Sequence, residues 1–139
     1  MEVICDGIHV HPAVVRSVFR LYGEDRVCLI SDAMRACGMP DGKYDLGGQL
    51  VTVANGCATI DTGSLAGSVS VLTRCFRNAV KFGIPLESAL KAATVNPARS
   101  VGLEDVGVIE PGKRADLLVL DRDLEIRHII MGGQLYQGA

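Results

Sequence analysis

The first third of the chain alternates between two spacings of apolar residues. Short apolar runs over 3–5 and 26–31 have the length and continuity of buried strands. Between them, the stretch from Pro12 to Tyr22 has apolar residues at helical spacing and polar residues on the opposite face. Pro12 suits the first turn of a helix, and Gly23 ends the pattern. We therefore predict a β-α-β unit with parallel strands.

The middle of the chain changes to a strand-like spacing. Residues 41–62 contain short alternating runs separated by glycines, and Asn55-Gly56 lies between two of these runs. An Asn-Gly pair between alternating runs is the strongest short signal for a hairpin. The pattern predicts an inserted hairpin over about 41–62.

Helical spacing returns after this insertion. Apolar residues recur with the helical period over 70–82, up to Gly83, and a second helix is expected from Pro85 to about Val95. Asn96-Pro97 is expected to end that helix, and a short turn should follow through Val101.

The last part of the chain has the pattern of an antiparallel sheet. Short apolar runs are joined by polar and glycine-containing turns, and the runs cover 115–120, 126–130 and 134–136. We predict two domains, one over 1–106 that includes the inserted hairpin and one over 107–139.

Composition limits what the chain can be. Its 139 residues are enough for one core but too few for a complete eight-stranded barrel, which needs about 250. A net charge of −2 gives no electrostatic case for nucleic acid or an anionic membrane as partner. The apolar runs are far shorter than the ~20 residues needed to span a bilayer, and no secretory leader precedes the first strand.

The five cysteines are an odd set without a CxxC pair. Two of them, Cys5 and Cys28, lie in apolar runs. This usage favours free thiols in a reducing cytoplasm and gives no zinc site built from cysteines.

Polar side chains follow both strands of the predicted β-α-β unit. Asp32 comes directly after the run 26–31, and Asp6-Gly7-Ile8-His9 follows the first strand. The carboxyl ends of parallel strands meet at the same edge, where α/β barrels place their catalytic groups. The sequence therefore predicts an enzyme site at this edge.

Four motifs, in this order, carry a resemblance to a known family. DGIHVHP starts at Asp6, LISDAM starts at Leu29 and GSLAGS starts at Gly63. The fourth motif consists of AATVNPARSVGL, which starts at Ala92, and GVIEPGKRADLLVLD, which ends at Asp121. The last string resembles the C-terminal end of the amidohydrolase superfamily. Together the motifs resemble the N-acetylglucosamine-6-phosphate deacetylase family over nearly the whole chain. The fold implied is α/β: the last two βα units of a (β/α)8 metal-dependent hydrolase barrel, plus part of a small β-sandwich.

The resemblance also implies roles for individual residues. Asp32 corresponds to the general acid/base of the family, a group that takes a proton from water and returns it to the leaving amine. Substrate contacts map onto two segments, Asp6, Gly7, Ile8 and His9 after the first strand, and Leu65, Ala66 and Gly67 in GSLAGS. The reaction implied is the hydrolysis of N-acetylglucosamine 6-phosphate to glucosamine 6-phosphate and acetate in the cytoplasm, with the parent enzyme a dimer.

The family holds a divalent metal, zinc or iron, with a glutamate and two histidines from earlier strands, and nothing in this chain corresponds to them. A metal lowers the pKa of bound water towards ~7 and polarises the carbonyl. We therefore expect the metal only in a full-length parent, and we expect this chain to be a shortened product, a gene fragment or the ordered remnant of a longer protein.

Each candidate residue has a plainer interpretation beside the functional one. Asp32 could cap a turn, and His9 could be a satisfied histidine at the rim. His11 is expected to be a solvated residue at a helix start, because a metal-binding His9–His11 pair would need further ligands. Structural or surface roles are likewise expected for His128 and Arg114, and Gly63 and Gly67 could serve only loop turns.

Three hypotheses remain open at this stage. The first is the deacetylase named above. The second is a related amidohydrolase that acts on N-acetylgalactosamine 6-phosphate or another N-acyl substrate. The third is a non-catalytic fragment whose open sheet edge pairs with another copy or with a missing half.

Overall fold

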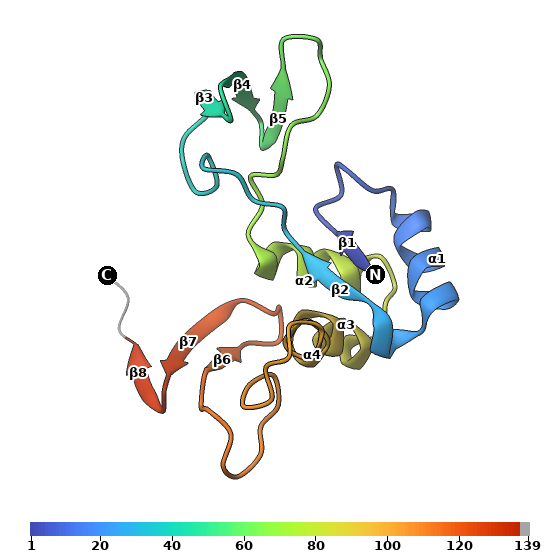
Figure 1. Ribbon diagram of the computed structural model, residues 1–139, viewed down its shortest axis with the longest axis vertical. Coiled ribbons are helices and arrows are strands. Elements are labelled where there is room, and N and C mark those ends of the chain that lie inside the picture. Colours follow the sequence, from blue (N-terminus) through green and yellow to red (C-terminus); the bar gives the residue numbers. More distant parts are fainter. Residues whose placement is uncertain (137–139) are drawn as a thin grey trace. The chain divides into compact units, whose positions relative to one another are not determined.

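The computed structural model describes residues 1–136, which form two compact units, one over 1–93 and one from 94 to the end of the described residues. The predicted domain boundary after residue 106 lies later in the chain than this division. Figure 1 labels the helices and strands of both units.

The first unit begins with the predicted β-α-β arrangement. Strands β1 (Glu2–Ile4) and β2 (Cys28–Ile30) pair in parallel, with Val3 opposite Leu29. Helix α1 (Pro12–Tyr22) connects them, followed by a 3-10 turn, η1 (Glu24–Arg26). The α/β class and the predicted helix bounds are thereby confirmed.

The local sequence explains where α1 begins and ends. The ring Nδ1 of His11 accepts a hydrogen bond from the Ala13 amide at 3.2 Å, and Pro12 follows as the first helical residue. Gly23 ends the helix by donating its amide to the Phe19 carbonyl at 3.0 Å. Burial of Val15 and Phe19, one turn apart, faces the helix toward the core.

The predicted hairpin is a three-stranded antiparallel sheet, which corrects the prediction. Strands β4 (Gln49–Ala54) and β5 (Cys57–Ile60) turn at Asn55-Gly56 as expected, but β3 (Gly42–Leu46) also pairs with β4. The sequence of β3 is largely polar because an edge strand bonds mainly through its backbone. A separate apolar cluster lies beneath this sheet, formed by Met34, Ala36, Val51, Val53 and Ala58.

Two helices complete the first unit. Both α2 (Leu72–Lys81) and α3 (Leu86–Ala93) contact β2 (Figure 1). The core of this layer is made by buried side chains from the strands and all three helices, namely Val3, Cys5, Val15, Phe19, Leu29, Cys75, Phe76, Ala79, Ile84 and Ala89.

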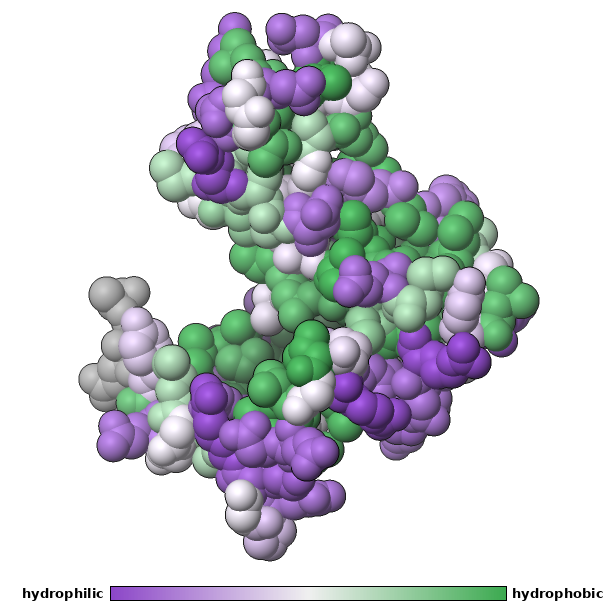
Figure 2. Space-filling model, viewed as in Figure 1, coloured by the Kyte–Doolittle hydropathy of each residue, from purple (hydrophilic) through white to green (hydrophobic). Residues whose placement is uncertain are grey.

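The second unit contains a short helix and a sheet. Helix α4 (Val95–Ser100) includes Pro97 in its first turn, so the helix begins before the predicted break at Asn96-Pro97. Strands β6 (Leu117–Leu120), β7 (Ile126–Met131) and β8 (Gln134–Tyr136) form the expected antiparallel sheet. Apolar side chains of this sheet reach the surface, while the loop before β6 is mainly hydrophilic (Figure 2).

Candidate functional site

The structure brings the three predicted site segments together at one edge of the β1–β2 pair. Asp6 to His9 follow β1, and Asp32 follows β2. The third segment joins through backbone pairing, since the Ser68 amide donates to the Asp32 carbonyl and the Met34 amide donates to the Ser68 carbonyl, both at 2.8 Å. The juxtaposition predicted for the carboxyl ends of the two strands is present.

Asp6 is the most enclosed charged group of this edge, with a side chain 1% exposed. Its Oδ1 accepts the backbone amides of Ile8 at 2.9 Å and His9 at 3.0 Å. Its Oδ2 lies 2.7 Å from the His9 Nδ1. Burial alone would raise the pKa of Asp6, but these backbone and ring hydrogen bonds hold it below the ordinary value. Asp6 is therefore a carboxylate at neutral pH.

The carboxylate determines how His9 is presented. Because an ionised Asp6 is only an acceptor, the proton of the His9 ring sits on Nδ1 and points at Asp6. The Nε2 atom has no hydrogen-bond partner among residues 1–136, and the side chain is 17% exposed. His9 can thus accept a hydrogen bond at Nε2 when neutral and donate one when protonated.

Asp32 differs from Asp6 in every respect that matters for proton transfer. It is exposed, and its carboxylate has no ion pair or hydrogen bond within the described part of the chain. Its backbone adopts φ of +50°, a left-handed conformation that aspartate tolerates better than most residues. The pairing of its carbonyl with Ser68 anchors the backbone and leaves the side chain unengaged.

The loop from Leu65 to Gly67 lies against Asp32. Leu65 bridges to Thr59, and the Ala66 amide donates to the Ala58 carbonyl at 3.0 Å. Gly67 has φ of +62°, and a Cβ there would lie 3.3 Å from the Met34 Cβ and 3.6 Å from the Asp32 carbonyl oxygen. The close approach of this loop to the strand end therefore requires glycine at position 67.

The predicted substrate-contact residues face different surroundings. Leu65 is 43% exposed, whereas Ala66 packs against the apolar cluster beneath β3–β5, so only its backbone could face a ligand. Gly7, at φ of +84°, turns the chain from β1 toward His9, and a Cβ there would lie 3.5 Å from the Phe82 ring.

Comparison with known proteins identifies the family. The model of the amidohydrolase family matches residues 2–136. This chain belongs to the amidohydrolase family. The family assignment agrees with the resemblance seen in the sequence motifs.

Relatives and solved structures of this amidohydrolase chain carry more specific names. An Escherichia coli protein provisionally named N-acetylgalactosamine-6-phosphate deacetylase is 41% identical over 97% of this chain and 81% of its own length. The N-acetylglucosamine-6-phosphate deacetylase of Lysinibacillus sphaericus is 40% identical over 96% of this chain and 35% of its own length.

A solved structure is similar over the same span. It is the Mycobacterium smegmatis N-acetyl-D-glucosamine-6-phosphate deacetylase, an aspartate-to-alanine mutant in complex with N-acetyl-D-glucosamine-6-phosphate. It is 41% identical with a TM-score of 0.92, over 96% of this chain and 36% of that one. Our amidohydrolase chain therefore spans about a third of the length of these two deacetylases.

Two polar side chains that the sequence patterns missed also lie near Asp6 at this edge. The hydroxyl of Ser68, the last residue of GSLAGS, lies 3.4 Å from the Asp6 Oδ2. The Asn78 side chain on α2 donates to the Cys5 carbonyl at 2.9 Å, next to Asp6. Neither hydrogen bond follows from spacing, because each joins residues more than sixty positions apart.

The plainer interpretations agree with the structure for two histidines and one arginine that are not among the candidate site residues. His11 is the exposed N-cap of α1, and His128 is exposed on β7. Arg114 forms a surface ion pair with Asp116.

A metal site is not found in the amidohydrolase chain as far as Tyr136, since no three ligating side chains there could hold an ion. The residues present thus do not fit a complete metal centre. Within the same residues, no helix is long and apolar enough to cross a membrane.

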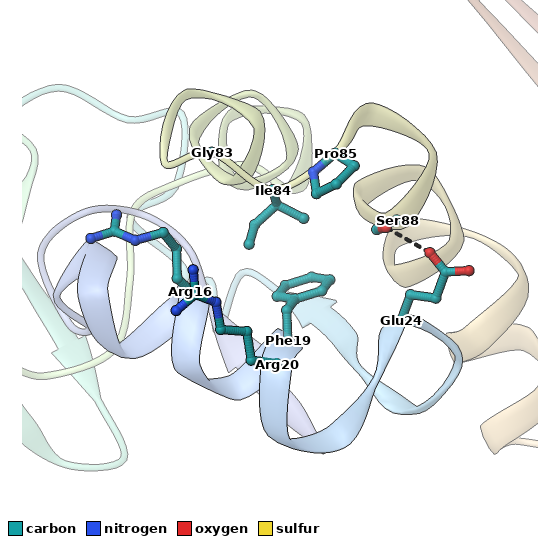
Figure 3. Close-up of a pocket in the computed structure, with 8 residues that line it drawn as sticks. All are labelled: Arg16, Phe19, Arg20, Glu24, Gly83, Ile84, Pro85 and Ser88. Carbon is teal, nitrogen blue, oxygen red and sulfur yellow. Dashed lines mark hydrogen bonds between the residues drawn. The ribbon is translucent and has the colours of Figure 1, made fainter.

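One pocket of about 320 Å³ lies between α1 and the start of α3, and none of the candidate site residues lines it (Figure 3). Phe19, Ile84 and Pro85 face one another across it. Two of its charged groups link elements: Glu24 accepts from Ser88 at 2.7 Å, and Arg16 donates to the Phe82 carbonyl at 3.1 Å. We therefore assign this pocket to the packing of the two helices.

Proposed function

We propose that this chain is the C-terminal part of a deacetylase that hydrolyses N-acetylglucosamine 6-phosphate to glucosamine 6-phosphate and acetate. One observation supports this most: the unengaged Asp32 carboxylate lies at a strand end shared with the Asp6–His9 pair and the Leu65–Gly67 loop. The names of the relatives supply the substrate class.

In this proposal Asp32 moves the proton. Its carboxylate takes a proton from the water that attacks the acetamide carbon. As the C–N bond breaks, Asp32 returns that proton to the amine nitrogen, so the products are acetate and the free amino sugar. The similar Mycobacterium smegmatis enzyme was solved with this sugar phosphate bound and with one aspartate replaced by alanine.

The neighbouring residues would bind the substrate. Because Asp6 occupies Nδ1, His9 presents Nε2 to the substrate, where it accepts from a sugar hydroxyl when neutral and donates to the acetyl oxygen when protonated. Asp6, Gly7 and Ile8 set the turn that places this ring. The backbone of Leu65, Ala66 and Gly67 would lie against the sugar phosphate.

The remaining requirements fall outside this chain. The amidohydrolase family is generally metal-dependent, and we propose that a glutamate and two histidines in the other two thirds of the parent protein bind the zinc or iron. We further propose that β1 and β2 are the last two strands of its barrel and that β6–β8 belong to its β-sandwich. The five free thiols agree with a cytoplasmic location, and we propose a dimeric parent.

A second candidate substrate has support of its own. The Escherichia coli relative, which matches this chain over most of its length, bears the name of the galactosamine isomer. The two sugars differ only in the direction of one hydroxyl. N-acetylgalactosamine 6-phosphate is therefore an equal candidate in any assay.

The experiment replaces the matching segment of the Lysinibacillus sphaericus enzyme with this chain. The chimera is assayed for acetate release from both sugar phosphates, and its metal content and thermal unfolding are compared with those of the unaltered enzyme. We expect a folded, metal-loaded chimera that hydrolyses at least one of them. Replacing Asp32→Asn should lower the rate by about 100-fold or more, since general acid–base groups contribute that much.

A matched control is available on the same unit. Asp61→Asn makes the same chemical change at an exposed loop residue and should leave the rate unchanged. A folded chimera that hydrolyses neither sugar would refute the proposed function. An Asp32→Asn chimera as active as its parent would refute the role of Asp32 alone.

A further inference from the structure

We propose that Ser68 is a positioning residue of this site, whose hydroxyl holds the Asp6 carboxylate while its backbone holds Asp32. The inference rests on the proposed function for its catalytic meaning. The structural part of the proposal is a link between the ends of β1 and β2, and this link can be tested without measuring enzyme activity.

The backbone half of the link is a short parallel bridge. Ser68 pairs with Ala33, donating its amide to the Asp32 carbonyl and accepting the Met34 amide, both at 2.8 Å. Ser68 therefore extends the parallel pairing beyond β2 and restrains the backbone on the C-terminal side of Asp32, the proposed proton carrier.

The side-chain half points the other way, toward β1. Ser68 is 2% exposed, and its Oγ accepts the Ser70 amide at 2.9 Å. The hydroxyl proton is then left to donate, and the Asp6 Oδ2 at 3.4 Å is its acceptor. This separation is long for a hydroxyl hydrogen bond, so the expected effect is moderate.

The same Oδ2 atom binds the His9 ring. A displaced carboxylate would therefore also displace the imidazole, whose Nε2 is proposed to face the substrate. Ser68 thus acts on the chemistry through Asp6 and His9 and does not need to touch the substrate.

The neighbouring Ser70 provides a matched control. It is as deeply buried, at 1% exposed, but its hydroxyl oxygen has no hydrogen-bond partner among residues 1–136. Ser70→Ala removes the same atom from the same segment without breaking a link to Asp6. A role in packing alone predicts the same result for Ser68→Ala and Ser70→Ala.

The experiment measures the carboxyl ¹³C signal of Asp6 and the ring ¹⁵N signals of His9 as a function of pH in the 139-residue chain. The other titratable groups near Asp6 are the thiols of Cys5 and Cys75, and burial raises the pKa of both, that of Cys5 to about 12. They stay neutral throughout the titration. Ser68→Ala should raise the pKa of Asp6 by about half a unit and shift the His9 signals, because a donor to the charged form is lost.

Ser70→Ala should change neither signal. Equal effects of the two variants, or no effect of Ser68→Ala, would overturn the proposal. If Ser68→Ala does not fold, the unaltered chain decides: a slowly exchanging Ser68 hydroxyl proton supports the link, and a freely exchanging one refutes it.

The effect of Ser68 on catalysis is measured in the chimera with the Lysinibacillus sphaericus enzyme. Ser68→Ala should lower kcat/KM about tenfold, because misplacing a positioned group costs rate without removing it. A shifted Asp6 pKa with unchanged kcat/KM would refute the positioning role. An inactive chimera whose NMR shifts follow the prediction would count against the proposed function and leave the link between the strand ends standing.

Discussion

Replacing Asp6→Asn should destabilise the first unit, mainly through the three shorter of the four hydrogen bonds of this carboxylate. Oδ1 accepts two backbone amides at 2.9 and 3.0 Å, and Oδ2 lies 2.7 Å from the His9 ring nitrogen. Hydrogen bonds to a charged group contribute about 1.5–3 kcal/mol each and neutral ones about 0.5–1.5 kcal/mol. Asparagine keeps one oxygen for the amides, so each of those bonds weakens by about 1 kcal/mol.

The third contact loses its charge and reverses its direction, because the asparagine NH2 can only donate to Nδ1, which requires the His9 proton to move to Nε2. Burying a neutral amide costs less than burying a carboxylate, which offsets part of the loss. We therefore expect the free energy of unfolding to fall by about 2 kcal/mol at pH 7. For a chain of this length that corresponds to a fall in Tm of roughly 6–10 °C.

The lowered pKa of Asp6 also predicts how the loss of stability in Asp6→Asn changes with pH. The folded-state pKa of Asp6 is lowered, so its stabilising contribution is complete above the unfolded pKa of about 3.9 and is lost as the pH falls through the folded pKa. The difference between the unaltered chain and the variant should therefore be largest near neutrality and shrink below about pH 4.

Urea unfolding followed by circular dichroism at pH 7 and pH 3 measures this difference, with Asp61→Asn as the exposed control. A loss below about 0.5 kcal/mol at pH 7 would show that the charge does not stabilise the turn, since ordinary surface substitutions have effects of that size. An equal loss at both pH values would show that the cause is packing.

Three further outcomes are expected. A thiol reagent should modify only the half-buried Cys37 and Cys57 in the folded chain and all five cysteines after unfolding, and rapid reaction of Cys5 would contradict its burial. Gly67→Ala should lower the free energy of unfolding by about 1–2 kcal/mol, because of its positive φ and the Met34 contact, whereas an unchanged urea midpoint would contradict that close approach. The isolated chain should show no deacetylase turnover and bind no metal in stoichiometric amount, and tightly bound zinc or iron in elemental analysis would disprove this expectation.

The sequence patterns predicted most of the helices and strands, because the limits of these elements depend on residues close to them in the chain. Helix α1 was predicted with its bounds, since Pro12 and Gly23 act on the chain directly around them. Strand β3 was missed because edge pairing needs backbone groups and not apolar side chains. The start of α4 was misplaced because a proline in the first turn of a helix is compatible with it.

The sequence predicted the part of the candidate site that lies at the ends of the two parallel strands. Parallel pairing alone brings Asp6, His9 and Asp32 to one edge. The hydroxyl of Ser68 and the amide of Asn78 reach this edge through folding of distant segments, which no periodicity records. The spacing also could not tell that Ala66 packs inward while Leu65 stays exposed.

The left-handed backbone at Asp32 has a practical consequence for protein engineering. Such a conformation costs most residues with a side chain about 1–2 kcal/mol, aspartate tolerates it better than most of them, and glycine adopts it freely. A directed-evolution screen for heat resistance alone would then enrich glycine at this position and discard the only acid proposed to serve the chemistry. Any library of variants of this protein should be screened for enzyme activity as well as for Tm, because at this position selection for Tm favours glycine and selection for activity favours aspartate.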